Sequence, residues 1–315
     1  MKCFITGAAG FIGSNLVDRL LKDNHTVIGF DNFSTGSHAF LNNAKQHPAF
    51  KLCEGDLLDQ DFLNTSMHGC DIVFHFAANA DVRFGTTHPE KDLQQNTIAT
   101  SNVLRAMHKN NIKKIVFAST GSIYGEASII PTPENAPFPI QTSFYGASKL
   151  AAEGFIQAYC EGFNFQAWIF RLVSILGERY THGHVVDFYK QLRNNPNQLN
   201  ILGNGQQKKS YLYVQDCIDA IFIALKKKHD KINIFNLGTD HYCEVNHSIE
   251  WICSHLNVLP TLHYSGSDKG WIGDNPFIFL DCTHIRQLGW KPKVSIQNAI
   301  IKTLQFLEKN AEAIV

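Results

Sequence analysis

Near its N-terminus the chain reads Phe4-Ile5-Thr6-Gly7-Ala8-Ala9-Gly10-Phe11-Ile12-Gly13-Ser14-Asn15-Leu16-Val17, a short apolar run with three glycines spaced three residues apart. The apolar run predicts a strand, and the periodic apolar residues of Ile12–Lys22 predict a helix. Gly7 permits a tight turn, Gly10 lets a pyrophosphate approach the backbone, and Gly13 lets the helix pack closely on the strand. The N–H groups at the start of the helix would then face the anion. The pattern predicts a strand–turn–helix unit that binds phosphate.

Further residues of the same kind of site follow the next strands. Asp31 lies 18 residues after Gly13, at the end of the second predicted strand. A carboxylate there accepts hydrogen bonds from both hydroxyls of an adenosine ribose and repels a 2′-phosphate, so NAD is favoured over NADP. Asp56, beside Leu57, follows the third strand and is placed to accept the adenine amino group. Small residues end the fourth strand and would let the cofactor lie against the backbone; they are Ala77 and Ala78.

Short apolar runs alternate with helical patterns through the first half of the chain. The predicted strands are Lys2–Thr6, Thr26–Phe30, Phe50–Cys53, Ile72–Phe76, Lys114–Ser119 and Phe165–Leu172, and the predicted helices include Ile12–Lys22, Leu93–Lys109 and Phe144–Cys160. Such alternation is typical of a parallel sheet covered by helices on both sides. A closed barrel alternates in the same way, and the glycine motif favours the open sheet. We therefore expect an α/β, Rossmann-type, doubly wound fold.

The alternation becomes less regular after about residue 173. We expect loops over Gly177–His184 and Asn194–Ser210, with Gly203-Asn204-Gly205 as a turn. Further elements are expected over Asp216–Lys226, Ile232–Leu237, Glu244–Leu256 and Ser295–Glu308. We predict a dinucleotide-binding domain over residues 1–173, with a segment of about 212–238 returning to it. Residues 174–315 would mainly form a smaller substrate-binding lobe.

Composition narrows the class of protein. The 315 residues are 44% hydrophobic and 18% charged, as in a soluble globular chain, and 28 basic residues balance 28 acidic ones. This balance argues against nucleic-acid binding. No apolar run approaches the ~18 residues of a membrane span, and the start of the chain lacks a signal-peptide pattern. The eight cysteines form no C-x-x-C pair, and the 15 histidines show no metal-ligand spacing. We expect a cytoplasmic protein with reduced thiols, no metal and no membrane contact.

A tyrosine and a lysine lie four residues apart on a predicted helix, in Tyr145-Gly146-Ala147-Ser148-Lys149. This spacing places both side chains on one face of the helix. A free phenol has a pKa near ~10, and a nearby ammonium together with an oxidised nicotinamide favours the phenolate. Tyr145 then becomes an acid/base catalyst for an alcohol–ketone interconversion, and Lys149 can also hold the nicotinamide ribose. Thr120, at the end of the fifth strand, can relay the proton because ligands bind at the carboxyl ends of such strands.

Taken together, these motifs resemble the extended short-chain dehydrogenase/reductase family, and in particular its NAD-dependent nucleotide-sugar epimerases and dehydratases. The motifs are G-x-x-G-x-x-G, Asp31-Asn32-Phe33-Ser34-Thr35-Gly36, H-x-A-A, S-T-x-x-I-Y-G and Y-x-x-x-K, in this order. The best match is to UDP-glucose 4-epimerase-like proteins. The resemblance implies that the NAD site also includes Phe11, Ile12, Asn32, Ser34, Thr35 and Gly36.

The residues after Thr120 indicate which reaction of the family to expect. In the dehydratases an Asp-Glu pair at this place supplies the acid and base for water loss, whereas this chain has Gly121-Ser122. The resemblance therefore implies a 4-epimerase: Tyr145 removes the proton of the sugar 4-hydroxyl, a 4-keto sugar forms, and the hydride returns to its other face. A reductase or dehydrogenase, a C2 epimerase and a non-catalytic NAD-sensing regulator remain alternatives.

The resemblance also implies a substrate side with departures from the family pattern. Ser122 and Thr120 would bind the sugar. Ser174 stands where R-x-x-N-x-x-G has Asn, Lys209 stands where G-x-G-x-x-x-R-D has Arg, and Lys269 takes the place of a basic diphosphate-binding residue. The expected substrate is UDP-glucose, UDP-galactose or an N-acetyl analogue, with base and sugar left open. A homodimer formed through Leu93–Lys109 and Phe144–Cys160 is expected.

Overall fold

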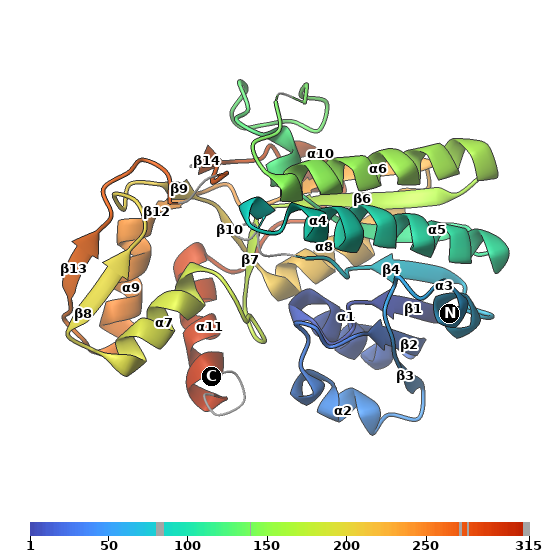
Figure 1. Ribbon diagram of the computed structural model, residues 1–315, viewed down its shortest axis with the longest axis horizontal. Coiled ribbons are helices and arrows are strands. Elements are labelled where there is room, and N and C mark those ends of the chain that lie inside the picture. Colours follow the sequence, from blue (N-terminus) through green and yellow to red (C-terminus); the bar gives the residue numbers. More distant parts are fainter. Residues whose placement is uncertain (80–84, 139, 271–272, 276, 311–315) are drawn as a thin grey trace.

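Figure 1 shows the computed structural model, which describes residues 1–79, 85–138, 140–270, 273–275 and 277–310. Its larger part is built around a seven-stranded sheet in the order β11-β6-β5-β4-β1-β2-β3, in which every neighbouring pair is parallel. The strands are β1 (Lys2–Thr6), β2 (Thr26–Asp31), β3 (Phe50–Glu54), β4 (Ile72–His75), β5 (Lys114–Thr120), β6 (Gln166–Leu172) and β11 (Ile232–Leu237). The predicted doubly wound parallel sheet is confirmed.

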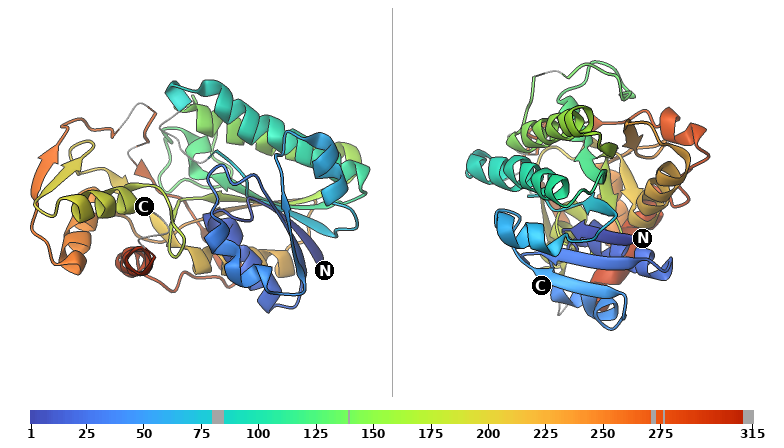
Figure 2. Two further views of the ribbon diagram at one scale, coloured as in Figure 1. Left: turned by 60° about the horizontal axis from the view of Figure 1, so that its bottom comes forward. Right: turned by 90° about the vertical axis from the view of Figure 1, so that its right-hand side faces the viewer.

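Helices cover both faces of this sheet because its strands alternate between two apolar cores. In β1, Cys3 and Ile5 join one core, whereas Phe4 joins the other. The first core holds α1 (Phe11–Lys22) and α8 (Val214–Lys227); the second holds α3 (Gln60–Ser66), α5 (Ala99–Lys109) and α6 (Phe144–Phe163). Figure 2 shows α5 and α6 on the opposite side of the sheet from α1. Apolar residues on both faces explain the near-continuous hydrophobic runs of the strands.

The position of the ligand crevice follows from the strand order. The chain runs outward from β1 through β2 to β3, then returns to place β4 on the other side of β1. Ligands of open α/β sheets bind outside the carboxyl ends of the strands at such a reversal. Gly7 follows β1 and Phe76 follows β4, so both chain segments enter this crevice.

A smaller lobe lies beside the sheet, at the left of Figure 1. Its helices α7 (His184–Asn194), α9 (Val245–Leu256) and α11 (Ile296–Lys309) pack against one another. Short strands complete it: β7 (Ser174–Leu176) pairs with β10 (Tyr211–Tyr213), β8 (Gln198–Ile201) with β13 (Thr261–Tyr264), and β9 (Lys208–Lys209) with β12 (Cys243–Glu244) and β14 (Phe277–Ile278). The remaining elements are η1 (His38–Leu41), α2 (Asn42–Lys45), α4 (Pro89–Asp92), the π-helical turn η3 (Leu93–Ile98), η4 (Gly121–Tyr124) and α10 (Thr283–Gln287).

The sequence-based assignment was wrong for parts of this lobe. The segment 194–210, expected to be a loop, contains β8 and β9. Both strands are short, and β8 alternates exposed and buried residues over only four positions, which gives a weak pattern. The helix α7 begins at His184, where a loop was expected, and no helix was predicted over it. Its buried residues have helical spacing; they are Val185, Val186, Phe188, Tyr189 and Leu192.

The described residues contain neither a membrane-spanning helix nor a cluster of metal-ligating side chains. No helix in this part of the chain is long and apolar enough to cross a membrane. Within the same residues, His, Cys, Asp and Glu side chains form no group of three able to hold a metal ion.

Candidate active site

The glycine turn at the end of β1 is packed so closely that side chains would not fit. A Cβ added at Gly13 would lie 1.9 Å from the Gly7 carbonyl oxygen. Gly7 has a φ of +70°, and a Cβ there would lie 2.7 Å from the amide nitrogen of Ala77. Gly10 caps α1 with an extended backbone, and its N–H donates to the Gly7 carbonyl at 3.1 Å. The first N–H groups of α1 therefore start directly at the crevice, with Phe11 and Ile12 in the first turn.

Asp31 is held rigidly beside this turn. Its Oδ2 accepts from the Ala9 N–H at 2.9 Å, and its Oδ1 accepts from the Phe33 N–H at 2.8 Å. Burial raises the pKa of the Asp31 carboxyl, and the two backbone N–H groups act against this rise. A Cβ at Gly36 would lie 3.0 Å from Asp31 Oδ1, so the loop returns tightly to the carboxylate. The geometry leaves a fixed acidic acceptor at the end of β2.

The remaining residues predicted for the nucleotide lie around Asp31. Asn32 Nδ2 donates to Asp56 Oδ2 at 3.0 Å, which joins the loops after β2 and β3. Asn102 of α5 donates to the Leu57 carbonyl at 3.0 Å and fixes the second loop. Ser34 and Thr35 are exposed on the loop after β2, and Ala77 and Ala78 are half-buried after β4. The structure thus gathers the predicted nucleotide residues along one edge of the sheet.

A tyrosine and a lysine on α6 face the end of β5. Ser143 caps this helix by accepting from the Gly146 N–H at 3.0 Å, which places Tyr145 in the first turn. Burial raises the pKa of Tyr145 to about 12, and hydrogen bonding with the side chain of Thr120 opposes the rise. Lys149 is buried, and burial lowers its pKa to about 7, while the Glu153 carboxylate acts to raise it. Thr120 and Tyr145 are therefore brought together, with Lys149 behind them.

A buried chain of hydrogen bonds connects the crevice to α6. The Thr100 hydroxyl donates to the Asn96 carbonyl at 2.5 Å, so it accepts from His75 Nε2 at 2.9 Å. His75 Nδ1 is then the acceptor for the Thr6 hydroxyl at 2.7 Å. Burial lowers the pKa of His75 to about 3. Asn96 Nδ2 in turn donates to Ser148 Oγ at 2.9 Å, next to Lys149.

The residues predicted to bind the sugar diphosphate lie on strands and a loop of the lobe. Lys209 Nζ lies 2.9 Å from Asp274 Oδ1 and donates to the Asn275 carbonyl at 2.9 Å. Lys269 is exposed and pairs with Glu126. Ser174 is exposed on β7. Both predicted phosphate-binding lysines are thus paired with carboxylates here. Residues 271–272, in the loop that carries Lys269, lie outside the described residues.

The lobe reaches the end of β5 through the segment after Lys269. Asn275 Nδ2 donates to the Gly125 carbonyl. A Cβ added at Gly121 would lie 2.8 Å from Ile278 Cγ2, so β14 packs on the turn that follows Thr120. Ser122 lies in this turn, where its Oγ accepts from the Thr120 hydroxyl at 3.2 Å. Residues of the lobe therefore border the catalytic candidates.

Sequence reasoning missed two buried charges next to this site, Glu153 of α6 and Arg171 of β6. Glu153 follows Lys149 by four residues, as Lys149 follows Tyr145, and this repeat could have marked it. Arg171 was noted only as the first residue of a motif. Their pairing across two elements leaves no local pattern in the sequence.

The geometry agrees with a match to known proteins. The model of the NAD dependent epimerase/dehydratase family matches residues 3–238. The chain belongs to the NAD dependent epimerase/dehydratase family. A relative from Mycolicibacterium smegmatis, named UDP-glucose 4-epimerase, is 29% identical over 99% of this chain and 100% of its own length. The mouse dTDP-D-glucose 4,6-dehydratase is 26% identical over 98% of this chain and 89% of its own length.

Solved structures with similar folds are also 4-epimerases of UDP sugars. A crystal structure of a UDP-galactose 4-epimerase is 35% identical and has a TM-score of 0.89, covering 98% of this chain and 99% of its own. The UDP-glucuronic acid 4-epimerase from Bacillus cereus, solved with UDP-glucuronic acid and NAD, is 27% identical with a TM-score of 0.89, covering 98% of this chain and 99% of its own.

The residues of this chain fit the dinucleotide that the family uses. The close approach of Gly13 to Gly7 opens the helix N-terminus to a pyrophosphate, and Asp31 offers a fixed acceptor for a ribose. The two half-buried alanines after β4 have small side chains, which suits a cofactor lying against the backbone. The acidic Asp31 also matches the 2′-hydroxyl of NAD better than the 2′-phosphate of NADP.

Proposed function

We propose that the protein is an NAD-dependent epimerase that inverts C4 of a UDP sugar through a transient 4-keto sugar. One observation carries this proposal: Tyr145 hydrogen-bonds with Thr120 at the carboxyl end of β5, beside the crevice where the glycine turn and Asp31 lie. Lys149, four residues along the same helix, packs on Phe117 of that strand. Ligands bind at this edge of open α/β sheets. The arrangement suits removal of a proton from an alcohol next to a bound dinucleotide.

The chain's own residues handle the proton. The phenolate of Tyr145 takes the proton of the sugar 4-hydroxyl, with the Thr120 hydroxyl as relay, and the resulting phenol returns a proton after the sugar has turned. Burial raises the pKa of Tyr145 to about 12, which disfavours the phenolate. Because an opposite charge nearby favours the ionised form, we infer that the Lys149 ammonium, together with the oxidised nicotinamide of bound NAD, offsets this cost. The chemistry that bound NAD supplies is reversible hydride exchange with C4 of the sugar.

The turn after Thr120 supports epimerisation over dehydration. Loss of water from a 4-keto sugar needs an acid and a base near the leaving hydroxyl. Gly121 carries no side chain, and the Ser122 hydroxyl accepts a hydrogen bond from Thr120. Neither residue supplies a carboxyl group. We therefore favour the epimerase over the dehydratases that also resemble this chain.

The substrate side is assigned to residues of the lobe and its borders. We infer that Ser122 and Thr120 contact the sugar, and that Ser174, Lys209 and Lys269 contact the diphosphate. We propose that residues 1–173, with a returning segment of about 212–238, form the NAD-binding part. Residues 174–315 would mainly form the lobe that binds the sugar nucleotide, because the residues inferred to contact the diphosphate lie there. In support, Lys209 is half-buried on β9, and the segment after Lys269 packs on the end of β5.

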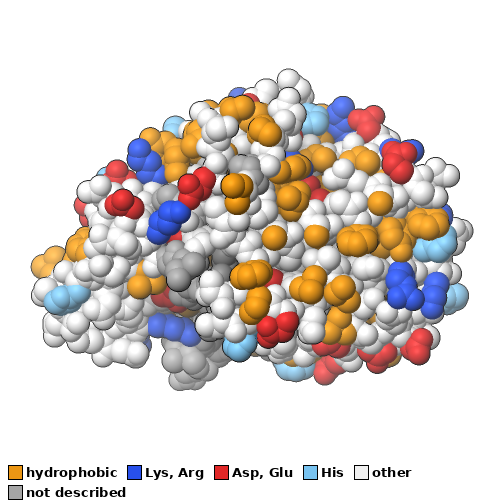
Figure 3. Space-filling model, turned by 45° about the horizontal axis from the view of Figure 1, so that its top comes forward, with side chains coloured by type: hydrophobic (Ala, Val, Ile, Leu, Met, Phe, Trp, Pro, Cys, Tyr) orange, Lys and Arg blue, Asp and Glu red, His pale blue; other side chains and the backbone are white. Residues whose placement is uncertain are grey.

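We also propose a homodimer formed through α5, α6 and the turn η3. Large apolar side chains are exposed on η3 and α6; they are Leu93, Ile98, Phe144, Phe155 and Phe163. Figure 3 shows hydrophobic side chains grouped on the part of the molecule that carries these helices. Phe155→Glu should give a monomer in sedimentation velocity, whereas Leu259→Glu, an exposed position on the lobe, should not. A wild-type monomer at micromolar concentration would contradict the dimer.

The test of the proposed function is NMR of the product after incubation with a panel of UDP sugars, without added cofactor. We expect conversion to the C4 epimer and no net change in NADH absorbance. Tyr145→Phe should retain NAD and lower kcat by at least about 100-fold, the usual contribution of an acid/base group. In a second assay with NADH added, its stoichiometric consumption would instead identify a reductase. Near-normal turnover of Tyr145→Phe would refute the mechanism.

A further inference from the structure

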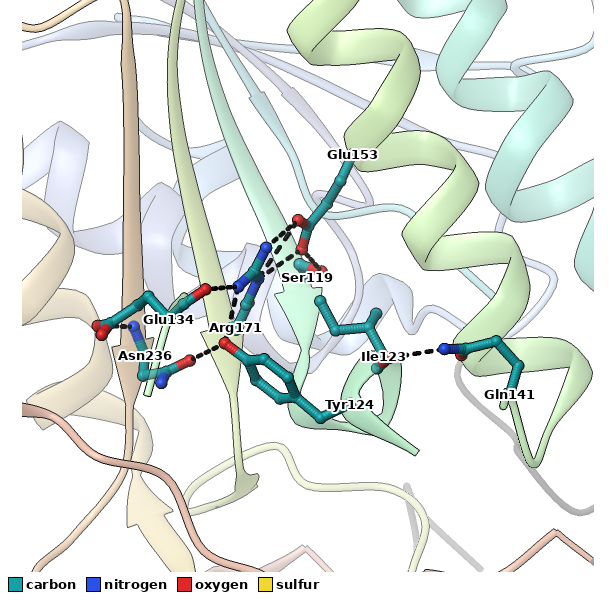
Figure 4. A network of polar contacts seen from close by, with 8 residues as sticks. All are labelled: Ser119, Ile123, Tyr124, Glu134, Gln141, Glu153, Arg171 and Asn236. Atoms are coloured by element: carbon teal, nitrogen blue, oxygen red, sulfur yellow. Dashed lines mark hydrogen bonds and ion pairs between the residues drawn. The ribbon is translucent and has the colours of Figure 1, made fainter. Parts of the chain in front are cut away.

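A buried ion pair lies under the catalytic end of β5. Arg171 and Glu153 are 2% and 0% exposed. Arg171 Nη2 lies 2.8 Å from Glu153 Oε2, and Arg171 Nε lies 3.1 Å from Glu153 Oε1. Figure 4 shows the guanidinium facing the carboxylate between α6 and the sheet. Desolvation offsets most of the attraction within such pairs, so stability alone is a weak explanation for this one.

The pair is tied to the chain on both sides of Thr120. The Ser119 hydroxyl donates to Glu153 Oε1 at 2.5 Å, and Ser119 directly precedes Thr120. Arg171 Nη1 donates to the Tyr124 hydroxyl at 2.7 Å, and Tyr124 ends the turn that follows Thr120. Displacing the Glu153 carboxylate would therefore remove the side-chain anchor of the residue that precedes the threonine.

The same carboxylate faces the catalytic lysine. Residues 145, 149 and 153 follow one another at four-residue intervals, which places them along one face of α6. Burial lowers the pKa of Lys149 to about 7, and the Glu153 carboxylate acts against that fall. Other elements bring further titratable or charged groups to this part of the helix: His75 from β4, Asp92 from α4, Tyr124 from η4 and Arg171 from β6. Burial lowers the pKa of His75 to about 3 and raises that of Tyr124 to about 12, so both are neutral near pH 7.

We propose that Glu153 is a positioning residue for the epimerase reaction: its buried carboxylate keeps the Lys149 ammonium charged behind Tyr145 and fixes the end of β5 at Thr120. Arg171 holds this carboxylate in place and compensates its charge. The inference rests on the proposed roles of Tyr145 and Lys149 and adds a residue that touches neither substrate nor cofactor.

The test is the pH dependence of kcat in a variant that keeps the shape of the side chain and removes its charge. In Glu153→Gln the Lys149 ammonium loses its anionic neighbour, so it releases its proton at a lower pH. The alkaline fall of kcat should move to lower pH by about one unit, the usual minimum effect of a neighbouring opposite charge. Glu161→Gln is the matched control, because Glu161 lies on the same helix and forms an exposed ion pair with Lys231.

Further variants keep the test decisive if Glu153→Gln does not fold, since removing one partner of a buried pair strands the other charge. The double variant Glu153→Gln/Arg171→Gln removes both charges and should shift the alkaline fall of kcat in the same direction, because Glu153 is the charge that acts on the pKa of Lys149. Glu153→Asp keeps the charge and shortens the side chain. The alkaline fall of kcat in this variant should lie close to its pH in the wild type. Its kcat should stay below wild type because the contact with Ser119 is lost.

The test of Glu153 can fail independently of the test of the proposed epimerase function. A wild-type protein without epimerase activity would refute that function. The role of Glu153 would be overturned if the wild type is active and the alkaline fall of kcat lies at the same pH in folded Glu153→Gln and in the double variant. A lower melting temperature with an unchanged pH profile would likewise show a purely structural ion pair.

Discussion

The ammonium nitrogen of Lys149 lies 4.1 Å from the centroid of the Phe117 ring, so a buried cation packs on the face of an aromatic side chain of β5. A desolvated cation gains about 2 kcal/mol from such a contact. This gain is smaller than the cost of burial, which lowers the pKa of Lys149 from 10.5 to about 7. Lys149 therefore lowers the stability of the fold at the position proposed for the catalytic lysine.

Lys149→Met should stabilise the fold near and below neutral pH. An unfolded lysine binds its proton up to pH 10.5, whereas the folded one loses it near 7. Between these values the unfolded state holds more protons, so the destabilisation caused by Lys149 is complete below pH 7 and disappears toward pH 10.5. We expect a gain on the order of 4 kcal/mol at pH 6, decreasing as the pH rises. Urea unfolding from pH 6 to 10 measures it, and a constant difference across this range would contradict the prediction.

Two helical glycines should respond oppositely to the same substitution. A Cβ at Gly13 meets the Gly7 carbonyl oxygen at 1.9 Å, whereas one at Gly154 on α6 meets nothing within 4 Å. Gly13→Ala should move the helix away from the turn, destabilise the protein by about 1–3 kcal/mol and weaken NAD binding at least tenfold. Gly154→Ala should stabilise it by about 0.5–1 kcal/mol without affecting NAD. Thermal unfolding and NAD titration test both variants, and similar effects of the two would refute the packing argument.

His75 should make the protein sensitive to acid. Burial lowers its pKa from 6.5 to about 3, so the unfolded state binds one more proton between these values. The folded state is therefore destabilised as the pH falls through this range, by about 4 kcal/mol at pH 3. The free energy of unfolding of His75→Asn should fall less steeply as the pH decreases, and the difference in slope should correspond to one bound proton. His263→Asn, on the exposed strand β13, is the control. Parallel pH profiles of wild type and His75→Asn would exclude this role.

The parts of the site that the sequence predicts are those that depend on local spacing. The glycine turn, Asp31 at a strand end and the tyrosine–lysine pair of α6 each follow from residues within one or two elements. The pairing of Glu153 with Arg171 depends on how α6 packs on β6, and the contact of Thr100 with His75 depends on how α5 packs on β4. Neither packing is encoded within a short stretch of sequence.

The short strands of the lobe could not be predicted from the sequence for the same reason. Most strands of the central sheet are buried on both faces, whereas the edge strand β3 is only partly buried. Their apolar runs could be recognised, with ends within one or two residues of the observed ones. The strand β8 alternates over only four residues, and β9 has two. They are strands because β13, β12 and β14 pair with them, and these partners lie more than 30 residues away in the sequence.

Lys209 and its neighbour Lys208 provide the sharpest test of the substrate side. Lys209 Nζ reaches Asp274 and the Asn275 carbonyl at the border of the lobe, whereas Lys208 Nζ lies 5.4 Å from the ring centroid of Tyr242. If Lys209 binds the diphosphate, Lys209→Met removes a charge-assisted hydrogen bond worth about 1.5–3 kcal/mol. KM for the UDP sugar should then rise about 10- to 100-fold, with NAD affinity unchanged.

Lys208→Met is the matched control, because it removes the same charge from the adjacent residue of the same strand. Its KM should stay within about twofold of wild type, since a surface charge away from the ligand contributes little. Steady-state kinetics with UDP, measured as a competitive inhibitor, would separate the diphosphate from the sugar: the Lys209→Met variant should lose affinity for UDP by the same factor as for the substrate. An unchanged inhibition constant for UDP would place the lysine elsewhere in the mechanism, and equal effects of the two variants would show a general electrostatic influence instead of a contact.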